Sequence, residues 1–190
     1  MKESKTIIIG IMVAVLALFS QQAEAQYTKS SRSGFSIGVS GGVGVLHFTK
    51  GMDADETSSG IALPVKMGWF LKNNLAVYVN LSGQIYEADG LDRSFEGIIP
   101  TIQYWPSDRL WLSGGFGPSL DTRALYESKT ESQKTDWGKG LLLSTGYEFL
   151  QKANWALDIQ TQLLMASVSR EGLDNLEGAS FTLSLGFTLY

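Results

Sequence analysis

The sequence predicts an all-β protein: an eight-stranded antiparallel up-and-down barrel that crosses a membrane after a cleaved signal peptide. Apolar residues fall on every second position through most of the chain after Tyr27, a pattern typical of strands with one apolar face. Only 18% of the 190 residues are charged, against about 25% in an average soluble domain. Short and long polar links alternate between the apolar segments, as they do in bacterial membrane barrels.

The first 25 residues form the expected signal peptide. Two lysines precede an uncharged apolar run over residues 7–19, and Ala23-Glu24-Ala25 supplies the small-x-small pattern of a cleavage site. The apolar run is shorter than the roughly 20 residues that a membrane-spanning helix needs, so we expect export through the Sec pathway. The predicted organisation is a signal peptide over 1–25, a short lead-in over 26–33 and a barrel over 34–190.

Eight segments carry the alternating pattern. We expect strands over residues 35–45, 61–69, 75–86, 97–104, 110–120, 140–149, 155–165 and 180–189. The last segment is the most regular, because Phe181, Leu183 and Leu185 alternate with small polar residues. Three prolines interrupt the pattern, and since proline cannot donate to a ladder we expect them at bulges or rim positions. They are Pro64, Pro100 and Pro118.

The links between the strands differ in length and charge. Short turns are predicted at 72–74, 106–108 and 151–154, and long links at 49–59, 87–94, 121–136 and 169–178. The long links hold most of the acidic residues of the mature chain. Aromatic residues stand beside every short turn, so the short turns are expected at one end of the barrel, within an interfacial belt. The belt residues are Trp69, Tyr104, Trp105, Trp111, Tyr147, Phe149 and Trp155.

The residues on the face opposite the apolar one, called the second face, distinguish a membrane barrel from a soluble one. A soluble exported barrel that binds a small apolar ligand would bury its apolar face and expose a charged face. Here the second face is mainly Gly, Ser, Thr, Asn, Gln and Tyr, which suits an eight-stranded lumen filled by side chains. We expect Lys66, Glu148 and Asp158 to pair across the lumen. The full predicted lumen network is Lys66, Tyr78, Gln84, Glu148, Asp158 and Gln160.

Composition excludes several kinds of chemistry. The chain has no cysteine and one histidine, which excludes a disulfide framework, a thiolate metal site, a lipidated N-terminal cysteine and a multi-histidine metal site. The sequence pI of about 5.0 argues against a nucleic-acid binder. The acidic links lack the spacing of a known calcium loop. We therefore expect no metal, no cofactor and no nucleic-acid partner.

These features resemble the small outer-membrane β-barrel proteins of Gram-negative bacteria, the OmpA/OmpX-like group. In the final strand Ser184, Gly186 and Leu189 match the insertion signal of that group, and Tyr190 is the terminal aromatic on the opposite face from Leu189. The resemblance implies insertion into the outer membrane by periplasmic chaperones and the barrel-assembly machinery. It also implies contact with outer-membrane lipid and lipopolysaccharide, termini and short turns in the periplasm, and long loops outside.

The leading functional hypothesis is a monomeric, non-enzymatic barrel for envelope integrity or surface interaction, because an eight-stranded lumen is too narrow for a general diffusion pore. The alternative is a lipid A acylase or deacylase that uses His47. Its partners would come from Ser58, Ser59, Ser94, Asp53 and Asp92. Pro64 and Pro118 also suggest a lateral route for a lipid into the lumen.

Overall fold

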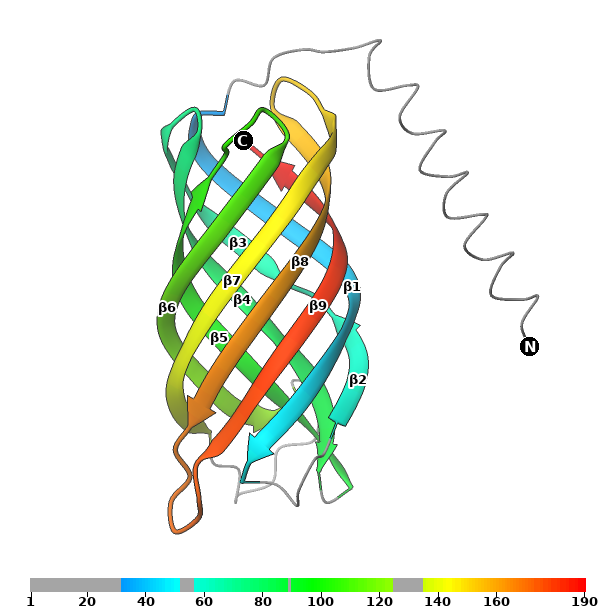
Figure 1. Ribbon diagram of the computed structural model, residues 1–190, viewed down its shortest axis with the longest axis vertical. Coiled ribbons are helices and arrows are strands. Elements are labelled where there is room, and N and C mark those ends of the chain that lie inside the picture. The colour runs from blue at the N-terminus through cyan, green and yellow to red at the C-terminus, as the bar shows by residue number, and fades with distance from the viewer. Residues whose placement is uncertain (1–31, 52–56, 89, 125–134) are drawn as a thin grey trace, which may run out of the picture.

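Nine strands form one antiparallel sheet that closes into a barrel, because β1 pairs with β9 (Figure 1). The computed structural model describes residues 32–51, 57–88, 90–124 and 135–190. The predicted signal peptide and most of the lead-in lie outside these residues. The strands are β1 (Gly34–Lys50), β2 (Thr57–Ala62), β3 (Val65–Lys72), β4 (Leu75–Ala88), β5 (Leu91–Tyr104), β6 (Leu110–Arg123), β7 (Asp136–Gln151), β8 (Trp155–Val168) and β9 (Leu176–Leu189).

The two short strands β2 and β3 share one strand position. β1 pairs with β3 through Gly34–Val39 and with β2 through Gly42–His47. Leu63 and Pro64 separate the two halves, and the Pro64 carbonyl accepts hydrogen bonds from the Ser40 amide (2.9 Å) and hydroxyl (3.0 Å). Counted in this way, the barrel has the eight strand positions that the alternation predicted, with an interruption at Pro64.

The other two strand prolines interrupt a single ladder. β5 pairs with β6 at Gly97 and Ser119, and the register resumes at Thr101 and Gly115. Pro100 lies in this interval on β5 and Pro118 lies in it on β6. Because neither residue can donate to a ladder, the two prolines account together for the gap.

One predicted long link is wrong. β4 continues to Ala88 and β5 starts at Leu91, and these two residues face each other in the register, so most of 87–94 is ladder rather than loop. Gly90 in the turn has φ +74°, a conformation that glycine adopts without strain. The polar composition of this segment marks strand ends beyond the apolar belt, where charge is tolerated.

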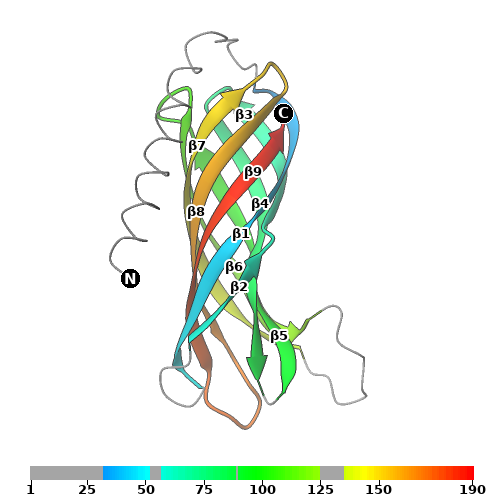
Figure 2. The same cartoon turned by 90° about the vertical axis from the view of Figure 1, so that its right-hand side faces the viewer.

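The two ends of the barrel differ in the connections between strands. The turn end holds the β3–β4, β5–β6 and β7–β8 connections and Tyr190, and the loop end holds the β1–β2, β4–β5, β6–β7 and β8–β9 connections (Figures 1 and 2). Within the described residues, no helix is long and apolar enough to cross a membrane. The outward strand positions are apolar and open: Ile61, Leu63, Phe116 and Leu185 are each more than 60% exposed.

The lumen is filled in layers. Inward positions near the turn end hold Phe70, Ala76, Tyr78, Trp105 and Trp111. Ile99, Leu142 and Leu164 form a small apolar cluster farther along the lumen. An apolar chamber closes the loop end, and it is defined by Leu46, Phe48, Tyr86, Phe95, Ala166, Val168 and Leu176. The lumen is therefore less polar than the composition of the second face suggested.

Substitution of Gly115 on β6 tests how closely this strand approaches Pro100 in the interrupted β5–β6 ladder. A Cβ there would lie 1.9 Å from the Pro100 carbonyl oxygen, so we expect Gly115→Ala to lower the free energy of unfolding by about 1–3 kcal/mol through overpacking. The measurement is urea unfolding in lipid vesicles, followed by tryptophan fluorescence. The matched control is Gly41→Ala, whose Cβ would meet only the Leu63 side chain at 3.8 Å. Equal effects of the two substitutions would contradict the close approach.

Candidate functional site

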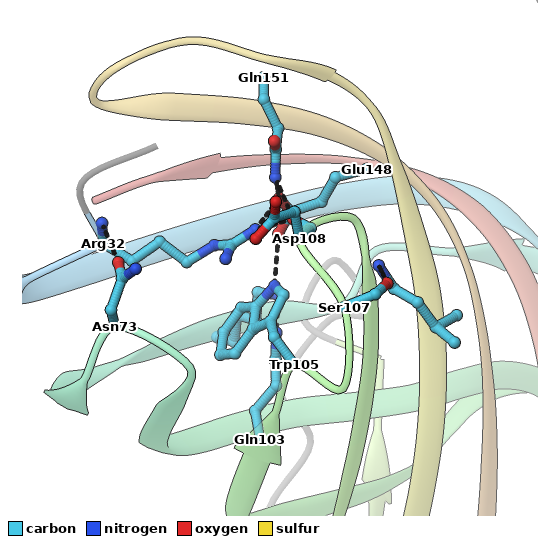
Figure 3. A network of polar contacts seen from close by, with 10 residues as sticks. Arg32, Asn73, Gln103, Trp105, Ser107, Asp108, Glu148 and Gln151 are labelled. Carbon is cyan, nitrogen blue, oxygen red and sulfur yellow. Dashed lines mark hydrogen bonds and ion pairs between the residues drawn. The ribbon is translucent and has the colours of Figure 1, made fainter. Parts of the chain in front are cut away.

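Arg32 closes the lumen at the turn end (Figure 3). It directly precedes β1 and is 5% exposed. Its amide donates to Asn73 Oδ1 (3.0 Å) in the β3–β4 turn, and its Nη2 donates to the Asp108 carbonyl (2.5 Å) in the β5–β6 turn and to Glu148 Oε2 (2.7 Å) on β7. One side chain and its amide thus connect three separate parts of the barrel rim.

Both carboxylate oxygens of Glu148 are occupied. Trp105 Nε1 donates to Oε1 (2.8 Å), while Gln151 Nε2 donates to Oε2 and, at 2.6 Å, to the Asp108 carbonyl. Glu148 and Gln151 are three positions apart, which would place them on opposite faces of a regular strand. The β7–β8 register shifts between Glu148 and Leu150, and this β-bulge turns both side chains inward.

Aromatic rings complete the closure. The Arg32 guanidinium lies 4.8 Å from the Trp105 ring centroid and 5.7 Å from the Tyr190 centroid, within range of a cation–π interaction. Phe70 packs on Tyr190 edge to face at 5.5 Å and on Trp105 at 5.3 Å. Burial, together with the nearby charge of Glu148, raises the pKa of the Tyr190 phenol above its ordinary value, so its hydroxyl stays protonated. We call Arg32, Phe70, Trp105, Glu148, Gln151 and Tyr190 the rim plug.

The six predicted lumen residues are all buried inside the barrel: Lys66, Tyr78, Gln84, Glu148, Asp158 and Gln160. The expected pairing among their charges is wrong. Glu148 pairs with Arg32, and within the described residues no ion pair within 4.0 Å joins Lys66 to a carboxylate. Lys66 Nζ instead donates to Gln103 Oε1 (3.3 Å) and lies 4.5 Å from the Trp111 ring centroid. Arg32 was missed because it stands in the lead-in, outside every strand pattern.

The other polar lumen side chains cross between strands. Tyr78 donates to Ser36 Oγ (3.0 Å), and Gln84 Nε2 donates to the Gly44 carbonyl (2.5 Å). Asp158 lies over Gly186, where a Cβ would be 2.3 Å from Asp158 Oδ1. These contacts join β1, β4, β8 and β9 through the lumen.

The predicted aromatic belt divides between two locations. Trp69, Tyr104 and Tyr147 face outward and are 45–55% exposed. Trp155 and Phe149 are half-buried, and Trp155 packs on Phe187 at 5.7 Å. The prediction is wrong for Trp105 and Trp111, which are buried in the lumen at 3% and 1% exposure. The inward position of Trp111 was predictable from the sequence, because Trp111 is separated by two and four positions from Ser113 and Gly115, which were placed on the lumen face.

His47 lies on the outer surface, and its described surroundings give no catalytic arrangement. Its Nδ1 is 3.1 Å from Thr57 Oγ1, with no carboxylate or catalytic serine bonded to it among the described residues. Asp53 lies outside those residues. No group of three or more metal-ligating side chains was found in the part of the chain that the structure describes.

The residues of the predicted insertion signal divide by face. Ser184 and Gly186 point into the lumen, Leu189 is 41% exposed, and Tyr190 packs into the rim plug. Their role in insertion stays a prediction.

We expect that breaking the Arg32–Glu148 ion pair of the rim plug strongly lowers the free energy of unfolding. Arg32→Met leaves a buried carboxylate without its partner, and we expect a loss of about 3–5 kcal/mol in unfolding free energy. The double variant Arg32→Met/Glu148→Leu leaves no uncompensated charge, so it should cost less than Arg32→Met alone. The control is Lys72→Ala at an exposed strand end, expected within about 0.5 kcal/mol of wild type. A double variant less stable than the single one, in the same urea titration, would refute the assignment.

No model of a known protein family matches the chain, and no curated protein sequence matches it. The solved structure of Neisserial surface protein A (NspA) is similar at TM-score 0.56 and 18% identity, covering 83% of this chain and 97% of that one. Ail, the attachment invasion locus protein and an outer-membrane protein of Yersinia pestis, is similar at TM-score 0.53 and 13% identity, covering 82% and 99%. The chain therefore has the OmpA/OmpX-like fold of the small β-barrels of the Gram-negative outer membrane.

Proposed function

We propose that the protein is a monomeric, non-enzymatic barrel of the outer membrane whose lumen is closed to solutes and whose loops act at the cell surface. The observation that carries this proposal is the filled lumen. The rim plug closes the turn end, Lys66 and Trp111 fill the lumen beyond it, and the apolar chamber closes the loop end. A barrel without a passage serves through its outer surface and its loops.

The orientation and biogenesis belong to the same proposal. The turn end lies in the periplasm and the loop end outside, after insertion by periplasmic chaperones and the barrel-assembly machinery. The outward apolar positions contact outer-membrane lipid, and the loop end contacts lipopolysaccharide. Support comes from the exposed apolar belt, since soluble proteins rarely expose a continuous apolar surface of this size. The same belt argues against the soluble ligand-binding alternative.

Among the described residues, the contacts of His47 and Ser94 and the charges at the loop end support a binding or structural role. His47 bonds only to Thr57 among the described side chains, and Ser94 is buried and donates to Glu96. The loop end instead offers fixed polar structure: Arg93 Nη2 pairs with Asp121 at 2.7 Å, and the Tyr86 hydroxyl donates to the same carboxylate at 3.0 Å. This arrangement supports rigid loop bases, which suit surface interaction or envelope integrity.

Membrane fractionation tests the location. We expect the protein in the outer-membrane fraction, with faster gel mobility before boiling than after it, because a closed barrel resists detergent unfolding. The control is Lys72→Ala, whose exposed strand-end position should leave both properties unchanged. Recovery of the native protein in the soluble periplasm without detergent would overturn the proposal.

Conductance tests the closed lumen. Purified wild-type protein in planar lipid bilayers should show no large steady channels, because side chains fill the narrow eight-stranded lumen. Trp105→Ala, which removes one ring of the rim plug, should remain silent as well, since Trp111 and Lys66 still obstruct the next layer. Steady large openings of the wild-type protein would contradict the proposed function.

A further inference from the structure

A groove crosses the outer wall of the barrel near the turn end. Its volume is about 610 Å³, and it extends over β1, β3, β4, β5 and β6, with Phe35, Met67, Val79, Pro100 and Gly114 in its lining. The outward side chains of the lining are apolar, and Phe35, Met67 and Val79 are each more than 40% exposed. The groove therefore opens toward the hydrocarbon of the membrane.

The strand registers explain why the wall is hollow at this place. One row of outward residues crosses the strands through directly paired positions: Phe35, Trp69, Val77, Ile102 and Gly114. The next row, two residues nearer the loop end on each strand, runs through Met67, Val79 and Pro100. Gly114 ends the first row without a side chain, and Pro100 ends the second row with a compact ring. The two rows thus leave a furrow between them.

The groove lies within one leaflet of the membrane. Gly114 follows Arg109, the last residue of the β5–β6 connection, by five positions, which is about 16 Å along a strand. A strand tilt of about 40° reduces this to about 13 Å of depth, within the roughly 15 Å that half of a hydrocarbon core spans. Trp69 in the same groove belongs to the outward aromatic belt. The leaflet whose headgroups surround the turn end therefore covers the groove.

The charges of the two barrel ends differ in sign. Among the described residues in or directly beside the three connections of the turn end, Lys72, Arg109 and Lys152 are basic and Asp108 is acidic. The charged residues of the loop end are mainly acidic: Glu87, Asp92, Glu96, Asp121, Asp136, Glu171, Asp174 and Glu177 against Lys50, Arg93, Arg123, Lys139 and Arg170. Basic residues beside a membrane attract anionic headgroups. The groove thus lies next to the end of the barrel that suits an anionic lipid.

We propose that the groove and the basic turn end form a binding site for one anionic phospholipid of the periplasmic leaflet. One acyl chain lies in the groove against Gly114, and Arg109 binds the phosphate. Arg109 directly precedes β6, the strand that carries Gly114, and a guanidinium can donate two parallel hydrogen bonds to phosphate oxygens. In hydrocarbon the chain is held by van der Waals packing, which a flexible chain maximises by following the furrow. The site rests on the proposed function, which places the turn end in the periplasm.

A second copy of the barrel fits this surface less well than an anionic lipid. Insertion gives every copy the same orientation in the membrane, so two barrels that met at the groove would bring their basic turn ends together, and like charges at an interface are unfavourable. An anionic headgroup in the same place is attracted. A lipid with a neutral headgroup gains the chain contact alone. Selectivity for the anionic headgroup therefore distinguishes a site from general contact between barrel and bilayer.

Lipid retention by the full barrel tests the site. The protein is placed in nanodiscs of equimolar dioleoyl phosphatidylglycerol and dioleoyl phosphatidylcholine, released into a mild detergent and weighed by native mass spectrometry. The two lipids have the same chains, so a difference in retention reports the headgroup. We expect one phosphatidylglycerol bound per monomer, in preference to phosphatidylcholine.

A pair of glycine variants tests the chain position. Gly114→Leu fills the groove and should lower the retention of phosphatidylglycerol, and a Cβ there would meet only the Leu143 side chain at 3.3 Å and the Leu142 carbonyl at 3.8 Å. The matched control is Gly41→Leu, at an exposed position of β1 outside the groove, where a Cβ would meet only the Leu63 side chain at 3.8 Å. The control should retain the lipid as the wild-type protein does.

A pair of arginine variants tests the headgroup. Arg109→Gln should lower the retention of phosphatidylglycerol about fivefold, which corresponds to about 1 kcal/mol for one basic residue beside an anionic surface. The matched control is Arg123→Gln, because Arg123 is a half-buried arginine at the opposite end of β6. This control should leave retention unchanged.

Heat-modifiable gel mobility shows that each variant is folded, and Val79→Phe fills the groove from β4 if Gly114→Leu does not fold. Equal retention of the two lipids by the wild-type protein, a lipid-free dimer, or unchanged retention in a folded groove-filling variant would overturn the site. Those results leave the outer-membrane location intact. A protein that does not enter nanodiscs as a folded barrel would instead overturn the proposed function, and the site with it.

Discussion

The constraint on which this structure depends is the pairing of backbone amides and carbonyls where no water can reach them. In hydrocarbon each unpaired group costs several kcal/mol, so a sheet survives there only when its first and last strands meet. β1 and β9 pair along most of their length. Closure then fixes the alternation, because every second residue must face lipid and every other residue must fit a narrow lumen. Small and amide side chains therefore predominate in the middle of the lumen.

Closure also determines how charge can be held inside. A charged group in the lumen needs a partner nearby, since an isolated buried charge is strongly unfavourable. Glu148 has Arg32, Trp105 and Gln151 around it, so its carboxylate is neutralised and fully hydrogen-bonded. The bulge after Glu148 brings Gln151 into the same group. The charges thus act as cross-links between turns that the ladder alone leaves separate.

The strand pattern was predictable because period-two alternation is a local property with a strong physical cause. Eight strand positions and the outward apolar face follow from it, whereas the interruption at Pro64 follows from the missing amide donor of proline. Long-range contacts were not predictable, and Arg32 is the clearest case: its partner Glu148 is 116 residues away. The inward Leu46 and Phe48 were also missed as a group, because a chamber assembled from five strands leaves no signature in any one of them. Trp105 and Trp111 lie in the lumen and not in the predicted belt, because alternation along the strand, and not proximity to a turn, determines which way a side chain points.

The rim plug has a consequence for the order in which the molecule forms. It joins Arg32, which precedes β1, to Tyr190, which follows β9, and to Glu148 of β7. These groups therefore come together only when the last strand of the barrel is in place. A barrel whose last strand is still unpaired lacks the Tyr190 ring of the rim plug, so its turn end is less completely closed. Sealing of the turn end therefore requires the last strand of the barrel to pair, so impermeability arises late in assembly rather than strand by strand.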